Sequence, residues 1–240
     1  MYDIAAKLEQ IEENIEAACS RSGRKRQEVK LMAVSKFHPV EAVESAFKAG
    51  ISLFGESRVA EGKEKFTGFW EKYPRDGSVK LHLIGSLQRN KAKAAASFFD
   101  CIQSVDRDSL IGELGGLTAD RESPLMIMLE YHTGEESKFG YPDLDSLFYA
   151  AEMALSFPGL RPFGLMTMAP FTDDEKEIRR SFRELVRARD ELEKRFIEPT
   201  GTEKYWSCLS MGMTNDYTIA IEEGSGLIRI GTAIFGERVK

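Results

Sequence analysis

Hydrophobic positions follow two different periods along this chain. Near the N-terminus, Ile4, Leu8, Ile11, Ile15 and Ala18 recur at spacings of three and four residues. That spacing predicts an amphipathic helix with a single apolar stripe. Beyond it, short apolar runs alternate with amphipathic stretches, a pattern typical of an α/β fold.

Eight apolar runs are candidate strands, and they occupy residues 29–35, 51–55, 80–85, 99–105, 124–131, 160–168, 204–210 and 226–231. The amphipathic stretches between them occupy residues 39–49, 56–70, 88–97, 107–120, 143–156, 173–197 and 214–223. Several runs are continuously apolar, as strands buried on both faces of a parallel sheet are. The pattern predicts one domain over residues 1–240, a single (β/α)₈ TIM barrel with an extra N-terminal helix. A doubly wound sheet would also alternate, usually with fewer strands.

Composition and charge exclude several classes of protein. Hydrophobic residues make up 42% and charged residues 30%, as in soluble globular proteins. The net charge of −6 comes without a clustered basic face, so neither a nucleic acid nor a membrane partner is expected. No apolar run approaches the roughly 18 residues of a membrane span, and the polar N-terminus does not read as a signal peptide. Three cysteines without paired spacing predict neither disulfides nor zinc, and favour the cytoplasm.

Lys36 is the first candidate for chemistry. It closes the apolar run LMAVSK, and TIM barrels place their active sites at the C-terminal ends of the strands. Burial there would disfavour the ammonium form of the lysine and leave a neutral amine. A neutral amine can attack an aldehyde and form a Schiff base. The alternative is a lysine whose charged end reaches solvent from the end of the strand.

Two turns near the C-terminus are rich in glycine and hydroxyl residues. They read LSMGMTND (209–216) and RIGTAIFGER (229–238), and they form the turns after the seventh and eighth candidate strands. Barrels often bind phosphate with these loops and a helix N-terminus. The alternative is ordinary turn chemistry, with Thr214 or Asn215 capping the helix that follows.

Arg229 and His82 both interrupt apolar strands. Because arginine stays charged, a buried Arg229 needs a partner, which is either a core carboxylate or the ring of a cofactor. His82 is expected to be a hydrogen-bonded core residue. Neither it nor His38 or His132 shows metal-ligand spacing, so no metal is expected. The polar loop 132–141 suits either a mobile flap or a solvated connection, and its Lys138 could meet an anion.

Eight ordered segments resemble one known family. They are AVSKFHP (33–39), LFGESRVAEGKEK (53–65), LHLIGSLQRNKAK (81–93), IQSVDR (102–107), GEESKFG (134–140), GLMTMAP (164–170), LSMGMTND (209–216) and RIGTAIFGER (229–238). The chain resembles the pyridoxal-phosphate homeostasis proteins (YggS-like, or proline synthetase-associated), which are related to the barrel domain of alanine racemases. The resemblance spans nearly the whole chain, and eight matches in order are far more specific than any one of them.

The resemblance implies pyridoxal 5′-phosphate (PLP) as the cofactor and assigns it residues. Lys36 corresponds to the lysine that forms the Schiff base, and Arg229 to the arginine that faces the pyridine nitrogen. The other matching positions are the phosphate-binding Ser210, Gly231 and Thr232 and the pocket-lining Met166 and Met211. Ser57 departs from the family, which usually has asparagine in an FGEN motif. Since serine is shorter and carries one hydroxyl, a contact near the ring is expected to be lost or bridged by water.

The resemblance therefore implies a PLP-binding protein of intracellular PLP homeostasis, without catalytic residues of its own. An arginine at the pyridine nitrogen keeps that nitrogen unprotonated and makes the ring a poor electron sink. Racemisation also needs a second acid–base group, which related racemases take from a tyrosine of a separate β-domain. This chain, ending at Lys240, is expected to have no room for that domain. The expected partners are PLP and candidate recipient apoenzymes, and a monomer is expected. A weak PLP-dependent amino-acid racemase is the alternative, and a Schiff-base aldolase acting on a phosphorylated sugar is a third reading.

Overall fold

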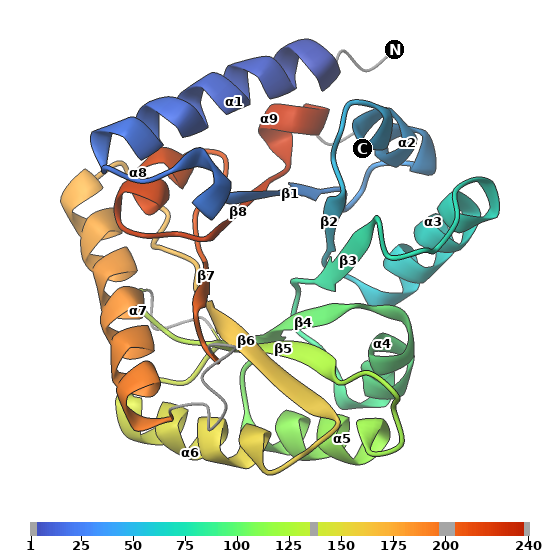
Figure 1. Ribbon diagram of the computed structural model, residues 1–240, viewed down its shortest axis with the longest axis vertical. Helices are drawn as coiled ribbons and strands as arrows, with labels where there is room; N and C mark the ends of the chain where they lie inside the picture. The colour runs from blue at the N-terminus through green and yellow to red at the C-terminus, as the bar shows by residue number, and fades with distance from the viewer. Residues whose placement is uncertain (1–3, 135–138, 197–204, 238–240) are drawn as a thin grey trace.

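The chain folds into a closed barrel of eight parallel strands (Figure 1). The computed structural model describes residues 4–134, 139–196 and 205–237. Neighbouring strands pair in the order of the sequence, and the last strand pairs with the first. The strands are β1 (Lys30–Val34), β2 (Leu53–Glu56), β3 (Lys80–Leu83), β4 (Cys101–Val105), β5 (Leu125–Glu130), β6 (Leu160–Met166), β7 (Cys208–Ser210) and β8 (Leu227–Ile230). The predicted (β/α)₈ barrel is confirmed.

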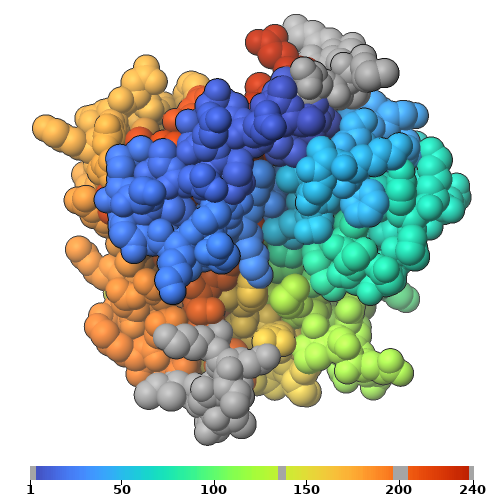
Figure 2. All heavy atoms as spheres, turned by 45° about the horizontal axis from the view of Figure 1, so that its top comes forward, coloured from blue at the N-terminus to red at the C-terminus, as the bar shows by residue number. Residues whose placement is uncertain are grey.

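Helices form the outer layer of the barrel. They are α1 (Ile4–Arg21), α2 (Val40–Lys48), α3 (Val59–Lys72), α4 (Ala92–Phe98), α5 (Asp108–Thr118), α6 (Leu144–Leu155), α7 (Glu175–Arg195), α8 (Tyr217–Glu222) and α9 (Thr232–Phe235), with 3₁₀ helices η1 (Arg26–Glu28) and η2 (Arg89–Lys91). The predicted N-terminal helix, α1, precedes the repeating units and packs against α8 and α9. Figure 2 shows it across the front of the molecule, in blue. Within the described ranges, no helix has both the length and the apolar content needed to cross a membrane.

Three elements near the C-terminus differ from the sequence prediction. Strand β7 begins only at Cys208, because Trp206 has a positive φ of 66° that breaks the extended backbone. Helix α8 begins at Tyr217, and Asp216 occupies the N-cap position instead of Thr214 or Asn215. The short helix α9 lies in a stretch that reads as a turn in the sequence.

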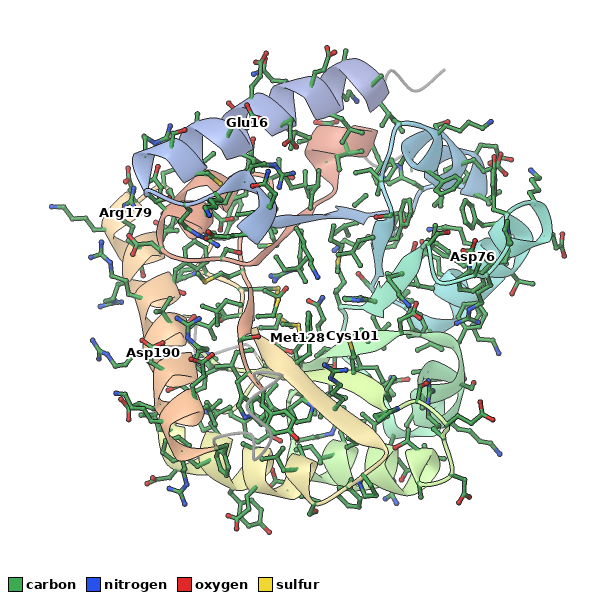
Figure 3. All side chains as sticks on the ribbon, viewed as in Figure 1. Glu16, Asp76, Cys101, Met128, Arg179 and Asp190 are labelled. Carbon is green, nitrogen blue, oxygen red and sulfur yellow. The ribbon has the colours of Figure 1, made fainter. Side chains whose placement is uncertain are left out.

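Strand side chains divide between two cores, because successive residues point to opposite faces of a strand. The larger core joins the outward-facing residues to the helices, and Leu165 belongs to it. The smaller core contains Cys101, Met128 and Met166, from three different strands. Figure 3 shows Cys101 and Met128 inside the ring of strands. The interior of the barrel is thus filled partly by flexible, polarisable sulfur-containing side chains.

Candidate functional site

Most of the residues predicted from the sequence lie at one rim of the barrel. Lys36 comes two residues after β1, Ser57 directly after β2, and Gly231 and Thr232 directly after β8, while Ser210 ends β7. Because all eight strands are parallel, these C-terminal ends meet at the same rim. The rim therefore brings together residues from four strands that are far apart in the sequence.

The backbone on both sides of Lys36 is held by side chains of α3. The carbonyl oxygen of Ser35 accepts a hydrogen bond of 2.6 Å from Lys65 Nζ. The amide of Phe37 donates to the carboxylate of Glu61, and Phe37 itself has a φ of 66°, which is unusual for a residue other than glycine. These contacts fix the path of the chain as it leaves β1, and with it the position of the Lys36 Cα atom.

A fully buried carboxylate, Glu56, completes this network behind the barrel wall. Its Oε1 accepts hydrogen bonds from Lys65 Nζ at 2.6 Å and from Ser35 Oγ at 2.7 Å. Its Oε2 has no partner among the described residues. Burial raises the pKa of Glu56, although Lys65 and the hydrogen bond from Ser35 act in the opposite direction. Lys65 therefore pairs with two carboxylates, since its Nζ also lies 3.1 Å from Glu61 Oε1.

Arg229 is buried and held by neutral acceptors. Its Nη1 donates to the carbonyl oxygen and the Oγ of Ser210, at 2.7 and 2.8 Å, and its Nη2 donates to the carbonyl oxygen of Thr167 at 2.8 Å. Burial lowers the pKa of Arg229 to about 10, while Asp216 and Glu130 raise it. In the part of the chain that the structure describes, Arg229 makes no ion pair, so a core carboxylate, one of the two partners considered from the sequence, is not in contact with it. An arginine has five N–H donors, and those left over can meet an acceptor such as a ring nitrogen.

Ser210 connects Arg229 to two buried polar residues. Its hydroxyl donates to Gln103 Oε1 at 2.7 Å, and Gln103 Nε2 lies 2.8 Å from His82 Nδ1. Burial, with Lys30 and Lys80 nearby, lowers the pKa of His82 to about 3, so the ring is neutral. The prediction that His82 is a hydrogen-bonded core residue is confirmed. Because the hydroxyl proton of Ser210 is already used, this side chain serves more directly to hold Arg229 than to donate to a phosphate.

The turns after β7 and β8 lie side by side and offer backbone amides. Gly212 has a φ of 96°, and its carbonyl oxygen accepts a hydrogen bond of 2.9 Å from the amide of Arg229. A Cβ atom on Gly212 would come within 2.6 Å of the Ala220 Cβ, so this turn requires glycine. Helix α9 begins at Thr232 directly after Gly231, and the first amides of a helix have no partner within it. Amides and the Thr232 hydroxyl in these turns suit an anion such as a phosphate.

The remaining predicted residues are not all brought together. Met166 lies in the small core inside the barrel, whereas Met211 lies in the large core that contacts the helices. Ser57 is half-buried and lines a cavity of about 360 Å³ with residues after β3. Its carbonyl oxygen would lie 2.2 Å from a Cβ atom on Gly85, so the two loops approach as closely as they do only because residue 85 is glycine.

Glu130, which the sequence analysis did not single out, also lies at this rim. It ends β5, only 5% exposed, and the closed order of the strands places β5 opposite β1. Burial and the nearby Asp106 carboxylate raise the pKa of Glu130 to about 7, while Arg229 lowers it. Its signal in the sequence was a carboxylate at the end of an apolar run, the same kind of interruption that drew attention to Lys36 and Arg229.

The ends of the 132–141 loop are tied to the rim. The amide of Tyr141 donates to the carbonyl oxygen of Glu130 at 2.8 Å, and the amide of His132 donates to that of Tyr141 at 3.0 Å. Residues 135–138, which include Lys138 and the middle of the loop considered as either a flap or a solvated connection, lie outside the described residues. Within the described ranges, no cluster of three histidine, cysteine or acidic side chains could hold a metal ion.

Comparisons with known proteins agree on one family. Residues 6–239 match the family described as alanine racemase, N-terminal domain. A pyridoxal phosphate homeostasis protein of Vibrio alginolyticus is 37% identical over 99% of both chains. The structure of PipY of Synechococcus elongatus with PLP bound has a TM-score of 0.81 and 30% identity, covering 98% of this chain and 100% of PipY. An alanine racemase of Clostridium difficile is similar in fold alone, with a TM-score of 0.76 at 11% identity, covering 99% of this chain and 60% of the racemase.

Proposed function

We propose that this chain, which belongs to the family of pyridoxal phosphate homeostasis proteins, binds PLP at the C-terminal rim of its barrel and holds it as a Schiff base on Lys36. The observation that carries the proposal is Arg229, a buried cation that has spare donors and forms no ion pair with any residue the structure describes. A buried charge without a counter-ion is costly, and an acceptor on a bound ligand relieves part of that cost. Lys36 and the turns after β7 and β8 surround the same rim.

Each residue has a separate part in this proposal. The bound cofactor supplies an electrophilic aldehyde, and Lys36 supplies the amine that reacts with it. Arg229 donates to the pyridine nitrogen. Its hydrogen bonds to Ser210 and Thr167 fix the orientation of the guanidinium group for this contact. The amides after β8 and the Thr232 hydroxyl donate to the phosphate. The clamp of Lys65 and Glu61 on the neighbouring backbone keeps Lys36 in place.

This arrangement favours holding PLP over using it in catalysis. Arg229 keeps its proton at neutral pH, since its pKa falls only to about 10. A charged donor at the pyridine nitrogen prevents that nitrogen from taking up a proton, and the ring then stabilises carbanions poorly. The proposed role is therefore to buffer, protect or deliver PLP in the cytoplasm, with PLP-dependent apoenzymes as recipients and a monomer as the working form.

Absorption spectra and mass spectrometry test this function. Purified protein is mixed with PLP, freed of excess, and scanned before and after reduction with borohydride. A visible band that disappears on reduction, with the adduct on the peptide containing Lys36, is the expected result. Lys36→Ala should abolish band and adduct, whereas Lys93→Ala, an exposed change on α4, should leave both intact. A colourless wild-type protein, or an adduct on another lysine, would overturn the proposal.

A weak amino-acid racemase is a second candidate, and Glu130 favours it. A racemase needs acid–base groups on both faces of the substrate, and Lys36 can serve only one. Glu130 lies at the end of the strand opposite β1, and with a pKa of about 7 it can both accept and donate a proton at neutral pH. Chiral analysis of alanine and serine after long incubation decides between the two. If the wild type racemises an amino acid and Glu130→Gln abolishes this activity without reducing the PLP content, the protein is a racemase. If the wild type shows no racemisation, this second candidate is rejected.

A further inference from the structure

A second cavity opens at the other rim of the barrel, where the strands begin. It has a volume of about 880 Å³, within the range of pockets for small molecules. Its wall includes the first residue of four strands, Lys30, Leu53, Lys80 and Leu227. Met126 of β5 and Phe163 of β6 also line it. Helix α1 closes one side with Leu8 and Glu9. Since TIM barrels carry their active sites at the C-terminal rim, this cavity is separate from the proposed PLP site.

Two lysines make the strand side of this cavity basic. Lys30 Nζ lies 5.8 Å from the centroid of the Phe163 ring and forms no ion pair among the described residues. Lys80 Nζ is 3.8 Å from Asp100 Oδ1, with about half of its side chain exposed. By contrast, the cavity's Arg26 is already paired with Glu12, whose Oε2 accepts from Nη2 at 2.8 Å.

His82 contributes a hydrogen-bond donor to the same cavity. Arg229 donates to Ser210 Oγ, so the hydroxyl proton of Ser210 goes to Gln103 Oε1. The Gln103 amide then donates to His82 Nδ1, which places the proton of the neutral ring on Nε2. Nε2 makes no hydrogen bond within the described part of the chain, although His82 is only 4% exposed and lines the cavity. Nε2 is not among the fully buried polar atoms that lack a partner, so it is accessible from the cavity, where a ligand oxygen can accept its proton.

We propose that this cavity binds a small organic acid, whose carboxylate lies among Lys30, Lys80 and His82 Nε2 and whose apolar body packs against the ring of Phe163. Met126 and Leu227 extend the apolar surface beside that ring, and flexible methionine adapts to different ligand shapes. Glu9 on the opposite wall orients the ligand, because it repels a carboxylate from the helix side toward the lysines. The site does not depend on PLP, although its hydrogen-bond chain ends at Arg229.

Binding of paired probes tests the proposal. The carboxylates phenylacetate, 3-phenylpropionate and 4-phenylbutyrate are titrated by calorimetry against their uncharged amides, with full-length protein both loaded with PLP and free of it. At least one carboxylate should bind about tenfold or more tightly than its amide, because a charged acceptor makes the stronger hydrogen bonds. Nitrogen NMR of the three histidines should show His82 Nε2 shifting on binding. Binding to both protein forms would separate this site from the PLP proposal.

Variants connect the binding to this cavity. Lys30→Gln alters an exposed residue and should weaken carboxylate binding about tenfold, and His82→Gln should weaken it further. Lys93→Gln, a matched change of an exposed lysine away from the cavity, should leave the affinity unchanged. If His82→Gln fails to fold, Lys30→Gln decides. Equal binding of every acid and its amide, an unmoved His82 resonance, or full affinity in Lys30→Gln would overturn the proposal.

Discussion

Lys65 and Arg229 are both buried cations near the C-terminal rim, but they are held in opposite ways. Lys65 Nζ lies 2.6 Å from Glu56 Oε1 and 3.1 Å from Glu61 Oε1, so its charge is neutralised within the protein. Among the described residues, the Arg229 guanidinium donates hydrogen bonds to neutral oxygens alone, those of Ser210 and Thr167. The first arrangement is complete without a ligand, and the second leaves a positive charge facing the site where we place PLP.

The contrast suggests how to separate structural from ligand-binding charges in such a barrel. A charge that already contacts an opposite charge contributes mainly to folding, and its loss leaves the partner unpaired. A charged side chain held by neutral acceptors has a fixed orientation, but its charge is not neutralised. Its loss should therefore affect ligand binding more than folding. The predictions that follow test this division, beginning with the largest effect.

Lys65→Met should destabilise the fold most, because it leaves Glu56 buried without a cation. Removing one partner of a buried ion pair costs about 3–5 kcal/mol. Urea unfolding of the protein without PLP measures the change. The double variant Lys65→Met with Glu56→Gln should recover part of the loss. Lys72→Met, in an exposed pair with Glu44, is the matched control and should leave the unfolding midpoint unchanged. An effect of Lys65→Met no larger than that of Lys72→Met would contradict the structural role of the clamp.

Glu130 should make stability depend on pH. Its pKa rises from 4.5 to about 7 in the folded state, so between these values the folded protein binds more protons than the unfolded chain. Stability therefore falls as pH rises from 4.5 to 7, by about 3 kcal/mol in all, and levels off above that range. Glu130→Gln should remove this part of the fall, which is measured as the difference in the free energy of unfolding between wild type and variant at each pH. If the free energies of wild type and variant depend on pH in the same way, Glu130 titrates normally.

Thr232→Val should weaken PLP binding without altering the fold. Thr232 is exposed at the start of α9, and its proposed hydrogen bond to a charged phosphate is worth about 2 kcal/mol. The dissociation constant for PLP, from the visible band, should rise more than tenfold while the thermal unfolding of the PLP-free protein stays the same. Thr67→Val, a change at an exposed position in the middle of α3, is the control. An unchanged dissociation constant would exclude Thr232 as a phosphate ligand.

Arg229→Met should destabilise the PLP-free protein far less than Lys65→Met does. It leaves the oxygens of Ser210 and Thr167 without a donor but also removes a buried charge, so a net loss of about 1 kcal/mol is expected. The same change should strongly impair PLP retention, the reverse of the pattern for Lys65→Met. Unfolding with and without PLP measures both quantities. A loss as large as that of Lys65→Met before PLP is added would remove the distinction between the two cations.

The alternation of apolar runs was enough to predict the barrel, because each strand and helix repeats a local pattern. Local patterns also drew attention to Lys36 and Arg229, since each is a charge within or at the end of an apolar strand, but their roles came from the family resemblance. They failed at α9 and at the start of β7, where Trp206 adopts a positive φ that no local preference predicts. There the surrounding tertiary structure determines the backbone.

The networks around these residues could not be predicted, because they join distant strands. The chain from Arg229 through Ser210 and Gln103 to His82 connects β8, β7, β4 and β3. No spacing in the sequence reveals which polar residues face one another inside a barrel. The pairing of Lys65 with Glu56 and Glu61 is closer in sequence, yet its importance depends on burial, which becomes visible only once α3 packs on β2.

The pairing of β1 with β8 has a consequence for how the chain acquires this structure. Lys30 pairs with Leu227 and Ala33 with Ile230, so the barrel closes through contacts nearly two hundred residues apart. Contacts between such distant residues slow folding, because a long loop must be ordered before they form. During synthesis β1 therefore leaves the ribosome long before its partner and carries an unpaired edge, which invites association with other chains. Helix α1 also cannot complete its packing until late in synthesis, because α8 and α9, against which it packs, are among the last elements to be made.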